Sequence, residues 1–298
     1  MLKIWDYVFL MRPILMLPGW GIILLAHKRS SHHSPTTSKL ILTMLAATLL
    51  YGGVYILNQI FDRETDRINR KLFLLSEGYV AVKSAIWFSS FCFISSLVLS
   101  FYISQTIGLL FSLMFILNLF YSVPFFSFKN KPVLGLLTNA IGFGVLNFLV
   151  GWTLDSELIW KGVWYSLPYF LAVSSIYLNT TLLDVEGDRR VNKITLGIKS
   201  GLEKTLWISM VLISATLISA IFLKDLPMMT TSAVALILNF RMSVSKKIKD
   251  IVLTNKVSIL ILSLWAVYFY PGYLVILGIG FAATKAYYKQ RFQVNYPV

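Results

Sequence analysis

The stretch KLILTMLAATLLYGGVYILNQIFDRETDR, residues 39–67, decides the fold of this chain. Residues 40–61 carry no charged side chain, and at 1.5 Å per residue they are long enough to cross the ~30 Å hydrocarbon layer of a membrane as one α-helix. Residues 62–67 then bring three acids and two arginines within six positions. We therefore expect a membrane-spanning helix that ends in a densely charged turn.

Long apolar stretches continue along the rest of the chain. Apolar residues make up 57% of the 298 and charged residues only 13%, whereas about a quarter of the residues in a soluble domain are charged. The further apolar stretches lie at 84–103, 106–121, 133–152, 162–183, 204–223, 226–240 and 257–283. The chain is therefore predicted to be an all-α, polytopic membrane protein with a single domain, residues 1–298, and nine or ten transmembrane helices.

Two segments decide how these helices are bent and counted. Residues 5–26 contain Arg12, Pro13 and Pro18, so this first span is expected to be kinked. It lacks a short apolar core with a small-residue cleavage site, so it is interpreted as a retained span and not as a signal peptide. The stretch after residue 257 is too long for one ordinary span, and Pro271-Gly272 would break it into two, hence nine or ten.

The net charge of +14 is distributed unevenly between alternate connections. Most lysines and arginines fall in the connections predicted at 62–83, 124–132, 184–204 and 241–256. Such asymmetry orients a membrane protein with its basic loops in the cytoplasm, and it disfavours nucleic acid as the partner. The single cysteine excludes an internal disulfide and a thiolate metal site. The histidines of the polar segment 27–38, namely His27, His32 and His33, are expected to be solvated.

The charged turn has a counterpart later in the chain, LLDVEGDRR at 182–190. Of the 13 acids, six lie in these two short runs: Asp62, Glu64, Asp66, Asp184, Glu186 and Asp188. If each helix continues through its run, Asn58, Asp62 and Asp66 stack on one face, and Asp184 and Asp188 repeat the same spacing. Four predicted crossings separate the two runs, so both emerge on the same, basic side of the membrane.

Like charges spaced i, i+4 destabilise a helix, so the aspartate pairs need a compensating cation. Mg²⁺ takes hard oxygen ligands, uses one or two carboxylates and completes its shell with water and phosphate oxygens. Two facing pairs therefore suggest Mg²⁺ ions with a diphosphate between them, neutralised further by Arg63, Arg67, Arg189, Arg190 and Lys193. The competing interpretation is an ordinary acid–base surface at helix ends, such as Glu64 with Arg67. Glu64 and Glu186 fall off the aspartate face.

At these residues the chain resembles the UbiA superfamily of intramembrane prenyltransferases. NQIFDRETD (58–66) and DVEGD (184–188) are similar to that family's two aspartate motifs, and RIN follows Asp66 as it does in the family. YSVPFFSFKNKP (121–132) and Arg12-Pro13 are further similarities. The sequence departs from the family after RIN, where RKLFLLSEGYV lacks the usual prolines, and this leaves the acceptor open.

The resemblance implies nine transmembrane helices around a cavity and transfer of a polyprenyl group from its diphosphate to an acceptor. It implies that Asp62, Asp66, Asp184 and Asp188 hold Mg²⁺ and that Asn58 supports a metal-bound water or a phosphate oxygen. Tyr121 is the candidate aromatic face for the allylic carbocation, or alternatively an interface anchor. The candidate diphosphate contacts are Arg63, Arg67, Lys129, Arg189 and Lys193. The expected partners are an isoprenyl diphosphate donor, membrane lipid, and an acceptor that is either an aromatic quinone precursor or a prenylated glycerol phosphate.

Two other classes of membrane protein also use acids. A CDP-alcohol phosphotransferase gathers its aspartates in one continuous run, whereas here the two runs are far apart in sequence. An ion-coupled transporter places its acids near the membrane midplane on interrupted helices, whereas here they sit at helix ends beside basic loops. The prenyltransferase interpretation is therefore favoured over both.

Overall fold

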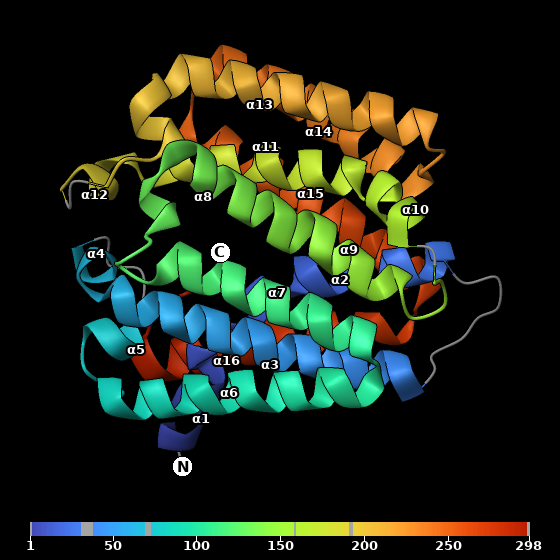
Figure 1. The fold of residues 1–298 in the computed structure, drawn as a ribbon. Helices are drawn as coiled ribbons and strands as arrows, with labels where there is room; N and C mark the ends of the chain where they lie inside the picture. Colours follow the sequence, from blue (N-terminus) through green and yellow to red (C-terminus); the bar gives the residue numbers. More distant parts are fainter. Residues whose placement is uncertain (1, 31–37, 69–72, 158, 191–192, 297–298) are drawn as a thin grey trace. The chain divides into compact units, whose positions relative to one another are not determined.

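The computed structural model describes residues 2–30, 38–68, 73–157, 159–190 and 193–296 (Figure 1). Within these ranges all regular structure is helical, which confirms the predicted all-α class. Six of the described helices are long and apolar enough to cross a membrane, and a bent pair at the N-terminus raises the number to seven. The protein is thus a multi-pass membrane protein, although nine or ten spans are not confirmed by this criterion.

Two predicted helix breaks are present. Helix α1 (Leu2–Leu10) and helix α2 (Pro13–Ser30) meet at a bend of 47°. Arg12 adopts a left-handed backbone conformation there, with φ of 54°, and Pro13 has no N–H with which to continue the α1 ladder. Near the other end of the chain, α15 (Ile248–Phe269) stops before Pro271 and α16 (Gly272–Phe292) begins after it.

The expectation that His27 is solvated is wrong. Helix α2 continues to Ser30, and His27 within it is only 1% exposed. Its Nε2 lies 2.9 Å from Oδ2 of Asp155, an acid far away in sequence. The histidines at 32 and 33 lie outside the described residues.

The predicted basic connection at 241–256 is also wrong. Helix α14 (Leu226–Ser245) and helix α15 leave only residues 246 and 247 between them. Arg241 and Lys256 are therefore helical. Long basic side chains can extend from a helix end toward water, so charge alone does not mark where a membrane helix stops.

The chain divides into two compact units. The first unit comprises Met1–Trp20, Pro35–Phe115 and Ala266–Val298, and the second comprises Gly21–Ser34 and Ile116–Trp265. Helices α2, α7 (Gln105–Ser122) and α15 pass from one unit into the other, so neither unit is one continuous stretch of sequence.

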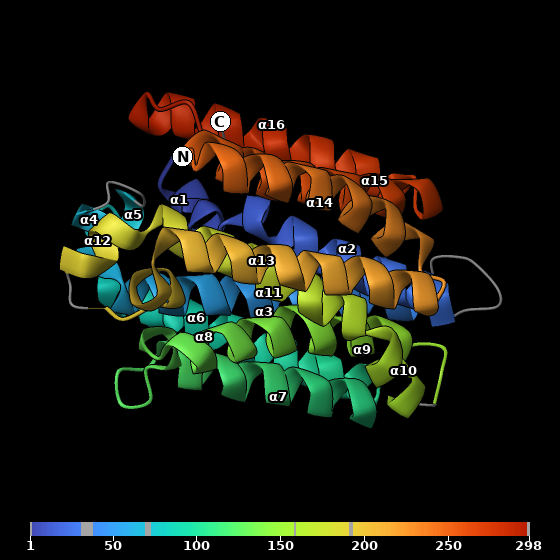
Figure 2. The same ribbon diagram turned by 90° about the horizontal axis from the view of Figure 1, so that it is seen from above.

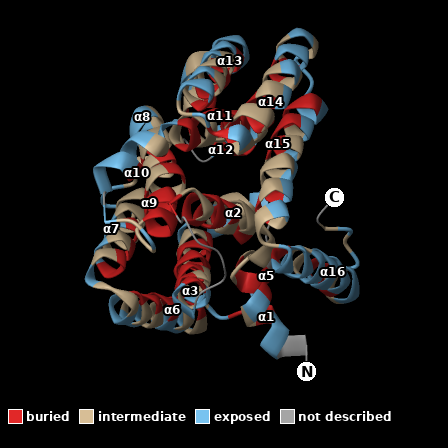
Figure 3. Ribbon diagram, turned by 90° about the vertical axis from the view of Figure 1, so that its right-hand side faces the viewer, coloured by how far each residue is buried: buried red, intermediate tan, exposed pale blue. Residues whose placement is uncertain are grey.

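In the first unit, α3 (Ser38–Phe61) packs along α6 (Val82–Ile103), and α1 contacts both α3 and α16 (Figure 1). The short helices α4 (Arg63–Ile68) and α5 (Phe73–Ser76) follow the end of α3. An apolar cluster joins α1, α3, α5, α6 and α16 through Phe9, Leu10, Ile56, Leu74, Leu75, Val80, Ala85, Tyr287 and Tyr288. Helix α3 is the central member of this unit. In its most apolar 18-residue stretch 56% of the residues are buried, compared with 28% in the corresponding stretch of α6 (Figure 3).

In the second unit, α13 packs against both α11 and α14 (Figure 2). From residue 128 to residue 245, the helices of this unit in chain order are η1 (Phe128–Asn130), α8 (Pro132–Asn139), the π-helix η2 (Ala140–Leu146), α9 (Asn147–Trp152), α10 (Ile159–Tyr165), α11 (Leu167–Leu183), α12 (Val185–Arg190), α13 (Leu196–Phe222) and α14.

Buried amides hold the helices of the second unit together. Asn179 on α11 donates to Asn255 Oδ1 on α15 at 3.0 Å, and its own Oδ1 accepts from Ser209 on α13 at 2.9 Å. Ser209 also lies 3.0 Å from Asn239 Oδ1 on α14. In lipid, apolar contact alone discriminates poorly between helix faces, so such hydrogen bonds help to set which faces meet.

Candidate active site

The first aspartate motif runs unbroken through the junction of α3 and α4. The Asp62 amide donates to the Asn58 carbonyl at 2.8 Å, and the Asp66 amide donates to the Asp62 carbonyl at 2.8 Å. These helical hydrogen bonds put the three side chains one turn apart on one face. All three are partly buried, whereas the off-face Arg63, Glu64 and Arg67 are exposed. The predicted stacking of Asn58, Asp62 and Asp66 is therefore present within the first unit.

The end of α3 is held in place by the break between α1 and α2. Gln59, which is 3% exposed, donates through Nε2 to the Leu10 carbonyl at 2.8 Å, at the last residue of α1. One turn earlier, the Tyr55 hydroxyl donates to the Leu15 carbonyl at 2.9 Å. The Leu10 carbonyl lies at the last residue of α1 and has lost its helical partner beyond the break, so Gln59 supplies a donor and helps to fix the turn that precedes Asp62.

The second aspartate motif has the same backbone spacing in more buried surroundings. The Asp188 amide donates to the Asp184 carbonyl at 2.9 Å, across the junction of α11 and α12. Asp188 is 3% exposed, and Lys193 Nζ lies 3.4 Å from its Oδ1. The Lys193 amide also donates to the Asp188 carbonyl at 2.9 Å, so the chain folds back and brings the ammonium to the acid.

A tyrosine pair lies beside this second motif. The hydroxyls of Tyr177 on α11 and Tyr121 on α7 are hydrogen-bonded, and Tyr177 also interacts electrostatically with Asp188. Gly135 leaves room for the pair, because a Cβ there would lie 2.5 Å from the Tyr177 hydroxyl oxygen. The sequence-based site did not include Tyr177. Its spacing gives a clue, since Tyr177, Asp184 and Asp188 follow an i, i+7, i+11 pattern on one helix face.

The remaining basic candidates of the second unit differ in exposure. Lys129, on η1, is only 6% exposed, which is unusual for a lysine. Arg189 is exposed. Arg190 forms an exposed i, i+4 ion pair with Glu186, with 2.7 Å between Nη2 and Oε1. The structure thus brings Lys193 to Asp188, and Tyr177 interacts with both Asp188 and Tyr121.

The donor groups of both motifs suit Mg²⁺. Each motif offers a pair of aspartates one helical turn apart. One or two carboxylates are what Mg²⁺ uses when water and phosphate oxygens complete its octahedral shell.

Comparison with known proteins is consistent with these motifs. A model of the UbiA prenyltransferase family matches residues 15–250. A homogentisate phytyltransferase of Synechocystis is 28% identical over 62% of this chain and 63% of its own length. A digeranylgeranylglyceryl phosphate synthase of Methanosphaera stadtmanae is 28% identical over 58% of this chain and 62% of its own. The matched stretch thus spans less than two thirds of these curated relatives.

The fold has solved counterparts. A UbiA homolog from Archaeoglobus fulgidus, bound to GPP and Mg²⁺, superposes with a TM-score of 0.71 at 18% identity, covering 92% of this chain and 99% of that one. A digeranylgeranylglyceryl phosphate synthase structure gives a TM-score of 0.68 at 20% identity, covering 90% of this chain and 100% of that one. At such identities the likeness shows the fold alone. The family model, which covers most of the sequence, shows that this chain belongs to the UbiA prenyltransferase family.

Proposed function

We propose that this protein is a Mg²⁺-dependent intramembrane prenyltransferase, which moves a polyprenyl group from its diphosphate to an acceptor. Family membership supports the reaction class. The observation that carries the proposal is the stacking of both aspartate pairs at helix ends, with Asp188 buried beside Lys193. We further propose that nine or ten spans surround the site and that the site faces the cytoplasm, because both motifs belong to the basic set of connections.

Transfer breaks the bond between the allylic carbon and the diphosphate oxygen, and the electron pair leaves with the diphosphate. Bound Mg²⁺ supplies Lewis-acid stabilisation of that developing charge. Asp62, Asp66, Asp184 and Asp188 would hold the metal, and Asn58 would bind a coordinated water or a phosphate oxygen. Further charge on the diphosphate would be neutralised by Arg63, Arg67, Lys129, Arg189 and Lys193.

Departure of the diphosphate leaves an allylic cation that water would quench. The Tyr121 ring would face this cation with its negative π-surface, and the hydrogen bond from Tyr177 fixes its hydroxyl edge. The acceptor then forms the new bond to the allylic carbon and loses a proton. Tyr121 thus stabilises charge that exists only during the reaction, which is where binding energy raises the rate.

The acceptor belongs to one of two chemical classes. Similarity to a homogentisate phytyltransferase favours an aromatic ring, and similarity to digeranylgeranylglyceryl phosphate synthases favours a prenylated glycerol phosphate. An acceptor panel that contains both classes separates them. Product masses from purified protein, Mg²⁺ and geranylgeranyl diphosphate would identify which acceptor gains a prenyl group.

The proposal is tested by a matched pair of variants in one motif. Asp184→Asn removes a proposed metal ligand, whereas Glu186→Gln removes the same charge two residues later from an exposed pair. We expect diphosphate release to fall about 100-fold or more in the first variant and to stay near the parent rate in the second. Equal activity of the two variants would exclude the metal-binding role.

A further inference from the structure

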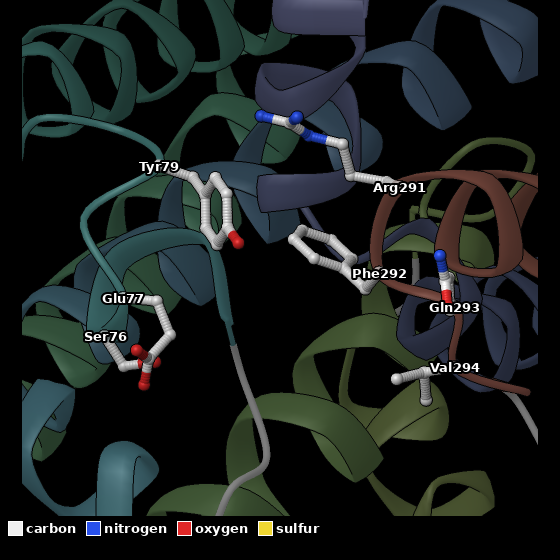
Figure 4. A pocket seen from close by; sticks show the side chains of 7 residues that line it. All are labelled: Ser76, Glu77, Tyr79, Arg291, Phe292, Gln293 and Val294. Carbon is white, nitrogen blue, oxygen red and sulfur yellow. The ribbon is translucent and has the colours of Figure 1, made fainter.

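A cavity of about 500 Å³ lies within the first unit, outside both aspartate motifs (Figure 4). The turn between α5 and α6 forms one wall, with Glu77 and Tyr79. The end of α16 and the residues after it form the other, with Arg291, Phe292 and Gln293. Because α6 is long and apolar enough to cross a membrane and begins at Val82, this cavity lies beside the end of a candidate span, where lipid headgroups are expected.

The cation of this cavity is held rigidly. Arg291 donates from Nε to Asp6 Oδ1 at 3.2 Å and from Nη2 to Asp6 Oδ2 at 3.0 Å. Asp6 is 1% exposed and also accepts from the Tyr287 hydroxyl at 2.5 Å. Nε and Nη2 form this bidentate pair, and Arg291 also hydrogen-bonds with Tyr287. Arg291 is therefore fixed in position, and because a guanidinium carries five N–H groups it keeps donors for a further oxygen.

Two aromatic rings separate this cation from an acid. Tyr79 and Phe292 meet edge to face, with centroids 5.1 Å apart, and the Arg291 guanidinium carbon lies 4.9 Å from the Tyr79 centroid. Figure 4 shows Glu77 on one side of the rings and Gln293 on the other. Glu77 is exposed and, in the described part of the chain, forms no ion pair, although the protein carries a net charge of +14.

We propose that this cavity binds a zwitterionic aminophosphate group, of the kind carried by ethanolamine phospholipids. The ammonium would lie against the Glu77 carboxylate and the aromatic rings, and the phosphate against the remaining N–H groups of Arg291. A purely anionic headgroup fits less well, because Asp6 already neutralises Arg291 and Glu77 repels an anion. A purely cationic ligand would meet Arg291. Because the acid and the cation lie on different sides of the aromatic rings, a ligand that carries one positive and one negative group matches the cavity best.

The test measures lipid retention by native mass spectrometry. Purified protein is exchanged into nanodiscs that contain equal amounts of phosphatidylethanolamine and phosphatidylglycerol, then released from them. We expect about tenfold more ethanolamine lipid than glycerol lipid retained on the parent protein. Glu77→Gln should abolish this preference, and Glu157→Gln, which removes another exposed acid outside the cavity, should keep it.

Soluble phosphoethanolamine distinguishes a lipid from a free metabolite. If phosphoethanolamine displaces the retained lipid, the cavity recognises the headgroup alone. If only intact lipid binds, the acyl chains contribute to binding. In both cases the proposal requires that Glu77→Gln lose the preference for ethanolamine lipid. Size-exclusion profiles confirm that the variants fold. Equal retention of the two lipids on the parent protein, or an unchanged preference in Glu77→Gln, would overturn the proposal.

Discussion

The two aspartate motifs have the same spacing, but different groups hold them in position. In the second unit, side chains surround the acid: Asp188 is buried, Lys193 lies against it, and Tyr177 links it to Tyr121. In the first unit, the motif lies on a helix end whose Arg63 and Arg67 are exposed, and Gln59 anchors the backbone just before it. The same ligand spacing can thus be positioned by neighbouring side chains or by the helix that carries it.

The largest expected effect concerns the acids themselves. Asp62→Asn and Asp188→Asn should each lower kcat/KM about 100-fold or more, because both motifs would be needed to offset the charge of a departing diphosphate. Asp188→Asn should also affect stability, because it removes the charge beside Lys193 and should destabilise the fold by about 1–2 kcal/mol.

Pyrophosphate release measures the first quantity and thermal unfolding in detergent the second. Glu64→Gln, an exposed acid next to the first motif, is the control for charge. An unfolding midpoint of Asp188→Asn equal to the parent value would show that the contact with Lys193 does not stabilise the fold.

The backbone anchor of the first motif is the next target. Gln59→Leu leaves the Leu10 carbonyl without its side-chain donor, and an unsatisfied buried polar group costs about 1–3 kcal/mol. Because Gln59 positions the turn before Asp62, we expect both lower stability and a higher Mg²⁺ concentration for half-maximal activity. Gln105→Leu, at an exposed glutamine, should change neither. A stability loss with an unchanged Mg²⁺ requirement would limit Gln59 to a structural role.

A smaller effect is expected from the tyrosine pair. Tyr177→Phe removes one hydrogen bond, worth about 0.5–1.5 kcal/mol, so kcat should fall by up to about tenfold with little change in KM for the donor. Tyr121→Phe should have a similar effect, and the double variant should be less than additive because the two share the bond. Additive losses would show that the hydroxyls act independently.

The smallest effect tests whether burial of an acid matters by itself. Asp225 precedes α14 in the second unit, is 1% exposed, and accepts from the Met228 amide at 3.0 Å. Burial raises its pKa above the usual value, while Arg29 opposes that rise. The folded state therefore keeps a proton that the unfolded chain has lost, so stability falls as pH rises from the ordinary aspartate range through the raised pKa.

Asp225→Asn should flatten this part of the pH–stability curve and leave prenyl transfer unchanged, because asparagine also accepts at a helix N-terminus. Unfolding midpoints measured across the acidic range provide the slope. An unaltered slope in the variant would assign the pH dependence to another group.

Much of the fold could be predicted because a membrane helix is recognisable in a sequence by its length and its apolar composition. The bend at Arg12–Pro13 and the break at Pro271 follow from the missing proline N–H, a local property. The motif spacing was also local, since i, i+4 positions stack in any helix. His27 was misjudged because its partner, Asp155, is remote in sequence, and no local pattern foretells such a pair. Tyr177 was missed for the same reason, since its role depends on Tyr121 of another helix.

The pairing of Asp6 with Arg291 has a consequence for biogenesis. Helix α1, which carries Asp6, is synthesised well before α16, which carries Arg291. Asp6 must therefore wait in the membrane, at a cost, until α16 arrives to neutralise it. We expect chains that stall before α16 to be recognised as misassembled and degraded, which pulse-chase labelling of a chain ending at Tyr270 would reveal against the chain that includes α16.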